Sequence, residues 1–319
     1  MIYISIPIHE KLDVVKNQAD NFKQFFPEAR IVYHVSKQAT FTIGEANDFM
    51  LKNKVDNVLI NPKQVDTGWG SIIQAHIQNI LFILEQKDAT KICFHSSNDM
   101  IVRSGLYNYL RDKDYVFHNR YVRKPSYWWV GNVAYDDYRL LDWLAIHGGG
   151  RIVASQIEGS MYHIAFLKEF VDELLNCQPV LQSGLFYPRE EILFSSFAVA
   201  KNLKSQGLPY ILSEVHRFDK KLWSYFDHYR FVFNDNSRIT RMMKKRLNDK
   251  LFDSTFYKIS KKDIEAIRGQ DTKFLAESFE MSDGGNHWQV YELNALFGVK
   301  RIERNMNDPL RQYILGLKS

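Results

Sequence analysis

The chain has 319 residues, of which 45% are hydrophobic and 25% charged, and its formal net charge is +5. This composition is typical of a soluble globular protein, and no apolar run approaches the roughly 20 residues that a membrane-spanning helix needs. Two cysteines, Cys93 and Cys177, exclude a disulfide framework and favour a reducing compartment. We expect no secretory leader, because Met1 runs directly into a predicted strand.

The N-terminal part of the chain alternates between strand-like and helix-like patterns. Hydrophobic runs predict strands at residues 2–8, 31–35, 58–60 and 91–94. Apolar residues at helical spacing predict helices over 12–26 and 73–84, and a capping box of Ser71 and Gln74 precedes the second helix. This alternation predicts a parallel sheet with helices on both faces.

Polar residues follow the predicted strands at their carboxyl ends. They are His9 and Glu10, Ser36 and Lys37, and residues 95–99. Ligands of parallel sheets bind beyond this edge, so we expect a binding site there. Within 95–99, His95 and Asp99 lie on a strand end and a loop rather than on one helical face. They indicate a metal site only weakly, and a solvated histidine beside a turn-forming aspartate is the alternative.

Two adjacent glutamates open a predicted helix in the second half of the chain. Pro188 suits the first helical turn, and Leu193 and Phe197 repeat at helical spacing after it. Glu190 and Glu191 would therefore lie at the mouth of this helix. Acidic residues there complement the helix dipole by roughly 0.3–1 kcal/mol. Helix stability alone explains them, and so does a general base on a fixed platform.

Basic residues gather in the C-terminal third, first over residues 238–250 and again over 300–311. These charges are consistent with a solvated helix face, with an anionic polymer such as a nucleic acid, or with a phosphate-bearing ligand. The sequence 283–286, Asp-Gly-Gly-Asn, indicates a turn or mobile loop. The chain shows no internal repeat and no clear linker, so we expect one domain over residues 1–319.

Missing motifs disfavour several enzyme classes. The run His147-Gly148-Gly149-Gly150 is similar to a lipase oxyanion loop, but the chain lacks the G-x-S-x-G nucleophile elbow of that chemistry. It also lacks the glycine-rich phosphate loops of Rossmann and Walker sites. We therefore interpret 147–150 as a flexible joint.

Short motifs from end to end resemble, in the same order, those of the core-2/I-branching glycosyltransferases, a family that includes the xylosyltransferases. The first strand ends in His9, as the family's does. The remaining motifs are residues 32–36 (I-Y-x-H-V-D in the family), 65–71 (V-x-W-G-G-x-S), 95–99 (L-S-G-x-D), 158–171 (G-S-Q-W…R-E-F-V) and 188–196 (P-D-E and the run after it). Each motif is short, and their shared order and spacing carry the resemblance.

The resemblance implies an α/β fold of the GT-A type, with a nucleotide-sugar-binding half (1–150) and an acceptor and catalytic half (151–319). It implies inverting, metal-independent transfer of a sugar from a UDP-sugar donor to a saccharide acceptor, with no cofactor and no nucleic-acid partner. A cytoplasmic relative of this kind would build a surface polysaccharide or a lipid-linked glycan. It would have no transmembrane segment and at most a peripheral position at the inner face of the membrane.

The resemblance also implies roles for individual residues. Glu191 is the expected base and Glu190 its solvated neighbour, because residues 192–196 match the run after the family's base. Counting from Pro188 favours Glu190 instead, which makes it the runner-up. The expected donor-binding residues are His9, Trp69, Gly70, Asp99, Lys300, Arg301 and Arg304. The expected acceptor-binding residues are Trp128, Trp129 and Tyr162, although the aromatic cluster 127–129 equally suits a core.

The chain departs from the family pattern at Ser36, where the family has aspartate, and at Arg189, which stands in the P-D-E motif. Three alternatives stay open. The first is a metal-dependent transferase that uses Asn98 and Asp99 as a degenerate D-x-D motif, since their oxygens suit Mg²⁺ or Mn²⁺. The second is a non-catalytic binder of nucleic acid or another anionic polymer, and the third is an inactive transferase scaffold.

Overall fold

The computed structural model describes residues 1–9, 11–68, 70–124, 126, 128–177, 180–181, 184–213, 238, 242, 258–275, 280–283 and 286–319. For residues 129, 280–283 and 286–288 it describes the backbone alone. Most of the basic segment 238–250 therefore lies outside the described residues, as do Trp69 and Tyr127.

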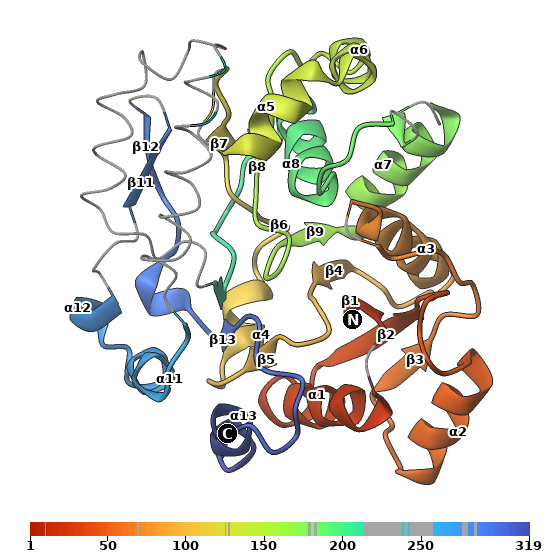
Figure 1. The fold of residues 1–319 in the computed structure, drawn as a ribbon, viewed down its shortest axis with the longest axis vertical. Helices are drawn as coiled ribbons and strands as arrows, with labels where there is room; N and C mark the ends of the chain where they lie inside the picture. Colours follow the sequence, from red (N-terminus) through yellow and green to blue (C-terminus); the bar gives the residue numbers. More distant parts are fainter. Residues whose placement is uncertain are drawn as a thin grey trace.

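A six-stranded sheet with the order β3-β2-β1-β4-β9-β6 forms the centre of the fold (Figure 1). Its strands are β1 (Ile2–Ile8), β2 (Ala29–Val35), β3 (Val58–Ile60), β4 (Lys91–Phe94), β6 (Tyr115–Val116) and β9 (Met161–His163). The first four run parallel to one another, and β9 runs against its neighbours β4 and β6. The prediction of an α/β fold with a mostly parallel sheet is confirmed.

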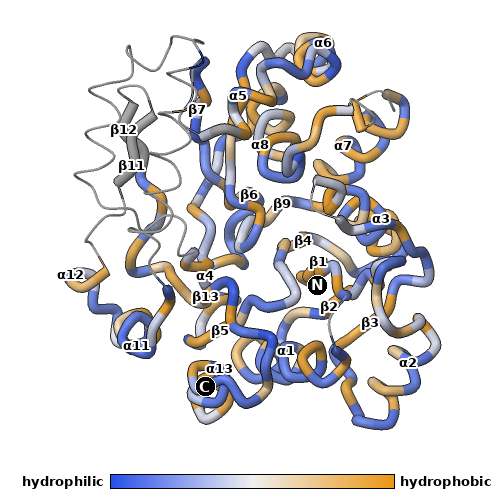
Figure 2. The backbone as a smooth tube through the Cα atoms, in the orientation of Figure 1, coloured by the Kyte–Doolittle hydropathy of each residue, from blue (hydrophilic) through white to orange (hydrophobic). Residues whose placement is uncertain are grey.

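Alternation along β1 shows how both faces of the sheet are covered. Ile4 and Ile6 pack in one hydrophobic core with α1 and α2. Tyr3 faces the opposite core, which is formed mainly with α3, α7 and α8. Successive side chains of a strand point to opposite faces, so one strand serves both cores. Along the flanking helices the tube in Figure 2 alternates between hydrophobic and hydrophilic colours, as expected where one helix face is buried.

The structure has helices in both halves of the chain. The bounds in the first half are α1 (Leu12–Phe25), α2 (Ile43–Lys52), α3 (Ile72–Leu84), α4 (Leu106–Leu110), α5 (Trp129–Asp136) and α6 (Tyr138–Ile146). Those in the second half are α7 (Ile164–Asn176), α8 (Glu190–Ala200), α11 (Lys261–Gly269), α12 (Thr272–Leu275), η4 (Leu293–Ala295) and α13 (Pro309–Leu315). Among the described residues, no helix has the length and apolar character to cross a membrane.

A three-stranded sheet brings the C-terminal region to the central one. It joins β10 (Ile211–Leu212), β13 (Gly298–Val299) and β5 (Met100–Ile101) in that order. Two strand pairs complete the described sheets, β7 (Arg120–Tyr121) with β8 (Val153–Ala154), and β11 (Glu280–Asp283) with β12 (Asn286–Gln289). The six-stranded sheet and the three-stranded sheet each contain strands from before residue 150 and strands from after it. The single domain over 1–319 stays a prediction.

Two local predictions are wrong. Ser71 forms no side-chain cap for α3; its hydroxyl instead donates to Gly68 O at 2.9 Å. The run 147–150 follows the end of α6 and forms its C-terminal cap rather than a flexible joint. Gly148 has a φ of 82°, and Gly149 N donates to Leu144 O at 2.8 Å. This is the left-handed C-cap that glycine favours.

Candidate functional site

The two glutamates stand on a fixed helix start. Arg189 is the N-cap of α8, so Glu190 and Glu191 occupy its first turn. Ser155 N donates to Glu191 O at 2.9 Å, and Ser195 Oγ donates to Val153 O at 2.7 Å. These bonds hold the first turns of α8 against β8 and the residue that follows it, which fixes where the carboxylates lie.

The environments of the two carboxylates differ. Glu190 is 5% exposed, and its Oε2 atom has no hydrogen-bond partner. Glu191 is partly exposed. The expectation that Glu190 is the solvated neighbour is wrong, because the first turn of α8 points Glu190 toward the interior. Glu191 is the glutamate of this pair with surface available for a ligand.

Both glutamates have raised pKa values. Burial, assisted by the Glu191 carboxylate, raises the pKa of Glu190 to about 8. Burial also raises the pKa of Glu191 to about 7, against the opposing effect of Lys300 and Arg301. A carboxyl group with a pKa near the working pH can both accept and release a proton, which is the property of a general acid or base.

Lys300 places a buried positive charge close to these glutamates. It follows β13 directly, and its backbone N donates to Leu212 O at 2.9 Å. Its Nζ atom lies 2.8 Å from Glu158 Oε1. Burial lowers the pKa of Lys300, but nearby carboxylates led by Glu158, with Glu191 among them, outweigh burial and hold it above its ordinary value. Lys300 is therefore a fixed cation at neutral pH.

Arg301 and Arg304 are exposed next to Lys300. Arg301 has a φ of 61°, a conformation that costs energy for a residue other than glycine and recurs at functional sites. Its charge is one of those that lower the pKa of Glu191. Arg311, by contrast, is fully buried, and its Nε atom donates to Glu303 O at 2.6 Å. Arg311 thus holds the backbone of the basic segment 300–304 from a buried position.

Arg120 is a further cation near Glu191, and Trp128 lies beside Arg120. The Arg120 guanidinium carbon is 5.3 Å from the centroid of the Trp128 ring, and the charge of Arg120 also lowers the pKa of Glu191. Trp128 is partly exposed, as a ligand contact requires. The Trp129 side chain lies outside the described part of the structure.

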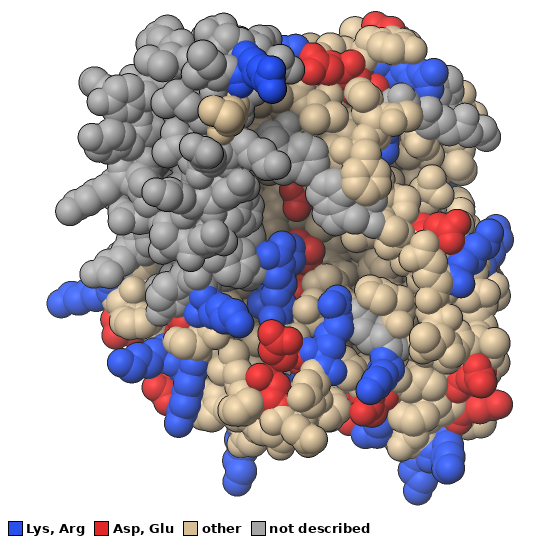
Figure 3. All heavy atoms as spheres, in the orientation of Figure 1, with Lys and Arg blue, Asp and Glu red and all other residues tan. Residues whose placement is uncertain are grey.

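The surface of the molecule has a hollow on the face shown in Figure 3. Figure 3 shows acidic atoms inside it and Lys or Arg atoms at its edge, in the part of the view where Figure 1 draws β6, β8 and α8. The charges of Lys300 and Arg301 lower the pKa values of Glu158 and Glu191. They come from segments far apart in the sequence, and the fold brings them together.

The residues expected at the strand ends have separate environments. β1 and β4 are neighbours in the sheet although β2 and β3 intervene in the sequence, so the sheet order reverses between them. Ligands of such sheets bind at this reversal. His9 ends β1 there and is exposed. His34, on β2, accepts a hydrogen bond from Val65 N through Nε2 at 3.0 Å. Burial lowers the pKa of His34 to about 4, so it stays neutral and able to accept.

Asp99 has a structural environment. It is fully buried, and its Oδ2 atom accepts from Ser96 N at 3.0 Å and lies 3.2 Å from His95 Nδ1. Its Oδ1 atom accepts from Ser96 Oγ at 2.6 Å. Both carboxylate oxygens are thus engaged within the turn after β4. Asp99 acts on the site through its charge near Lys300 rather than through an open carboxylate.

Gly70 lies in the turn before α3, which contacts the segment that leads into α8. Its φ is 88°, and a Cβ atom there would lie 3.1 Å from the Phe186 ring. Arg189 is buried and donates from NH1 to Gly70 O at 3.4 Å and from NH2 to Leu185 O at 2.6 Å. The turn before α3 is therefore joined to the segment that leads into α8. Phe186 is 63% exposed.

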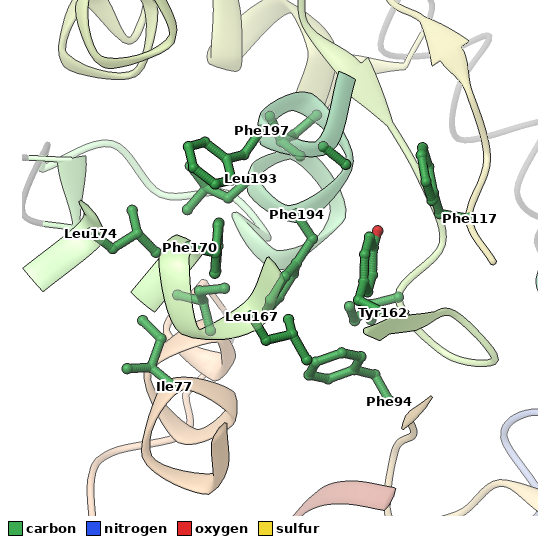
Figure 4. Packing of buried hydrophobic residues seen from close by; sticks show 14 of the residues in the cluster. Ile77, Phe94, Phe117, Tyr162, Leu167, Phe170, Leu174, Leu193, Phe194 and Phe197 are labelled. Carbon is green, nitrogen blue, oxygen red and sulfur yellow. The ribbon is translucent and has the colours of Figure 1, made fainter. Parts of the chain in front are cut away.

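Tyr162 lies in the core and not on an acceptor surface. Its side chain is fully buried, and its ring stacks on Phe117 at 5.5 Å and on Phe166 at 5.3 Å between centroids. Figure 4 shows Tyr162 within the aromatic cluster that includes Phe94 and Phe194. A fully enclosed ring has no face for a saccharide, which argues against this part of the sequence expectation.

His95 and Asp99 are the residues that the sequence offered as metal ligands. In the described part of the chain, no group of three or more His, Cys, Asp or Glu side chains is arranged to hold a metal ion. His95 and Asp99 do meet, at 3.2 Å, but His95 Nε2 pairs with the Tyr210 hydroxyl at 2.7 Å. Both members of this pair are buried and serve the turn after β4.

Sequence reasoning missed Glu158, Arg120 and Phe186. Glu158 was part of a motif but had no assigned role, and Arg120 stands alone in a short strand. No local pattern marks either residue, because their meaning comes from contacts between distant segments. Phe186 had a usable signal, since it is an aromatic residue just before the helix-starting Pro188.

No family model matches the chain, and no curated protein matches it. The crystal structure of S. aureus TarS is similar over 80% of this chain, with a TM-score of 0.35 and 11% identity. The match covers 44% of the TarS chain, which is less than half of its length. At this TM-score the likeness carries no argument about function.

Proposed function

We propose that the chain is a glycosyltransferase of the GT-A type, which transfers a sugar with inversion from a nucleotide donor to a saccharide acceptor. The observation that carries the proposal is the position of Glu191. Its partly exposed carboxylate stands within the electrostatic influence of Lys300 and Arg301. Inverting transfer needs a base for the acceptor hydroxyl and a positive field for the leaving diphosphate.

Glu191 acts as the base in this proposal. Transfer with inversion is one displacement at the anomeric carbon, so the acceptor hydroxyl must lose its proton as it attacks. The pKa of Glu191, raised to about 7 by burial, makes the carboxylate a stronger base than an exposed glutamate while leaving it substantially ionised at neutral pH. Glu190 holds its proton under the same conditions, because burial raises its pKa to about 8.

Lys300 and Arg301 stabilise the leaving nucleoside diphosphate. Negative charge develops on the diphosphate as the glycosidic bond breaks, and preorganised cations lower the energy of that state. The reaction proceeds without a metal ion in this proposal. The alternative metal site at Asp99 has little support, because both carboxylate oxygens already pair within the turn.

The donor binds at the reversal of sheet order between β1 and β4, close to His9 and the turn that contains Gly70. The order of the strands and the sequence resemblance support a UDP-sugar there. Trp128 and Phe186 are the exposed or partly exposed aromatic residues for the acceptor, since pockets that bind organic ligands are lined largely by such side chains. The sequence resemblance supports a role in the cytoplasmic synthesis of a surface glycan.

A ligand screen tests this proposal. The full chain is heated with a panel of nucleoside diphosphates and nucleotide sugars, and the midpoint of unfolding is measured. Ligands that bind the native state raise this midpoint by mass action. We expect a uracil nucleotide to raise it, with and without EDTA. A response to nucleic acid alone, with a steep dependence on salt concentration, would favour the polymer-binding alternative instead.

A further inference from the structure

The unliganded protein holds Lys300 with an internal anion. Lys300 Nζ lies 2.8 Å from Glu158 Oε1, and each side chain is 10% exposed. Glu158 precedes β9, and Lys300 follows β13. The cation proposed to meet the donor's diphosphate is therefore already engaged by a carboxylate.

The backbones on both sides of this ion pair are fixed. Gln156 Nε2 donates to Glu158 O at 2.7 Å, and Gly159 N donates to Phe94 O at 2.9 Å. Gly159 has a φ of 81°, and a Cβ atom there would lie 2.9 Å from Tyr210 N. Lys300 is fixed by its bond to the small sheet. Any exchange of partners must therefore come from the two side chains, and that of Lys300 is long and flexible.

Glu158 is incompletely satisfied even when paired. Its Oε2 atom is buried without a hydrogen-bond partner. Burial raises the pKa of Glu158, but Lys300 and Arg301 outweigh it and hold the pKa below its ordinary value. Glu191 adds a further carboxylate beside the same cations. An anionic ligand that enters this site must compete with the carboxylates of Glu158 and Glu191.

We propose that Glu158 competes with the donor diphosphate for Lys300, holding the ammonium group before the donor binds and taking it back when the product leaves. The inference rests on the proposed function, because it requires a diphosphate ligand. A diphosphate carries more charge than a carboxylate and attracts Lys300 more strongly, while Glu158 repels the ligand. Glu158 thus weakens binding of the nucleoside diphosphate product, which favours its release between turnovers.

Substitutions of Glu158 should increase the affinity for UDP rather than lower it. Glu158→Gln removes the competing charge and should tighten UDP binding about tenfold, or about 1.4 kcal/mol. Glu158→Asp keeps the charge on a shorter side chain, so it should tighten binding by less. It also guards against loss of folding in the first variant. A merely structural role would predict weaker binding, since damage to the site does not improve affinity.

The experiment is calorimetric titration of the full chain with UDP and, separately, with inorganic pyrophosphate. Glu169→Gln is the matched control, because it breaks another Glu–Lys ion pair, that of Glu169 with Lys201 at 2.6 Å. We expect tighter binding in both Glu158 variants, no change in the control, and loss of the gain when Lys300→Met is added to Glu158→Gln. Unchanged or weaker binding in the Glu158 variants, or a gain that survives Lys300→Met, overturns the inference. No binding of either probe by the unmodified protein overturns the proposed function together with it.

Discussion

Glu190 and Glu191 are adjacent in the sequence but differ in exposure, with Glu190 buried and Glu191 partly exposed at the start of α8. Successive side chains of a helix differ in direction by about 100°, so one side chain turns inward while the other stays partly exposed. Burial of Glu190 should therefore lower the stability of the protein when this group is ionised, whereas Glu191 is the proposed base. The two consequences can be measured separately.

Glu190 should destabilise the protein at alkaline pH. Its folded pKa, about 8, lies above its ordinary value of 4.5, so the folded state binds more protons than the unfolded state between these values. The stability that this proton contributes is present below pH 4.5 and is lost as the pH rises through 8. Thermal unfolding should show Glu190→Gln gaining stability relative to the unmodified protein between pH 5 and pH 9, by roughly 1 kcal/mol or more, because one pKa unit is about 1.4 kcal/mol. A difference that stays constant over this range would contradict the assignment.

Turnover should increase with pH through the pKa of Glu191. The base must be ionised to accept a proton, and its pKa is about 7, so kcat/KM should rise tenfold per pH unit below about 6 and level off above about 8. Because neighbouring carboxylates interact, the midpoint belongs to the group and not to one residue. Steady-state rates at acceptor concentrations below KM, with saturating donor, give the profile. A rate independent of pH from 5 to 9 would exclude a base of this kind.

Loss of Lys300 or Arg301 should weaken nucleoside diphosphate binding. A charge-assisted hydrogen bond contributes roughly 1.5–3 kcal/mol, so each alanine substitution should lower affinity about tenfold or more. Lys262→Ala is the control, because Lys262 is an exposed lysine of α11. Affinities that match the control would move the leaving-group site away from these two residues.

Gly70 should tolerate no side chain. A residue with a Cβ atom is strained at a φ of 88°, and the atom would lie 3.1 Å from the Phe186 ring. Gly70→Ala should therefore cost roughly 1–2 kcal/mol of stability and also reduce donor binding, since the turn and α8 are joined through Arg189. Gly269→Ala is the control, because a Cβ atom there meets nothing within 4 Å. Equal unfolding temperatures for the two variants would contradict this account of the turn.

Local patterns in the sequence predicted the elements that depend on neighbours in the chain. Alternating isoleucines gave β1, and Pro188 with the apolar spacing after it gave the start of α8. The helix α2 was missed although its signal is local, a capping box of Thr42 and Glu45.

The site depends on contacts that no local pattern encodes. Glu158 and Lys300 meet because β9 and β13 belong to different sheets that the fold brings together. The family resemblance marked Tyr162 as an acceptor contact, yet its place on β9 turns the ring into the aromatic core. A tyrosine in a short strand fits either face equally well, and the direction is set by packing from α7 and α8.

The central claim is that Glu191 removes the proton of the acceptor. The most direct test measures sugar transfer and donor affinity for Glu191→Gln and Glu190→Gln side by side, with the nucleotide sugar found in the ligand screen. We predict that Glu191→Gln lowers turnover by roughly 10²–10⁴-fold, the usual scale for a general base, with donor affinity almost unchanged, and that Glu190→Gln does far less. Reversed effects would assign the base to Glu190, and full turnover in both variants would contradict the claim.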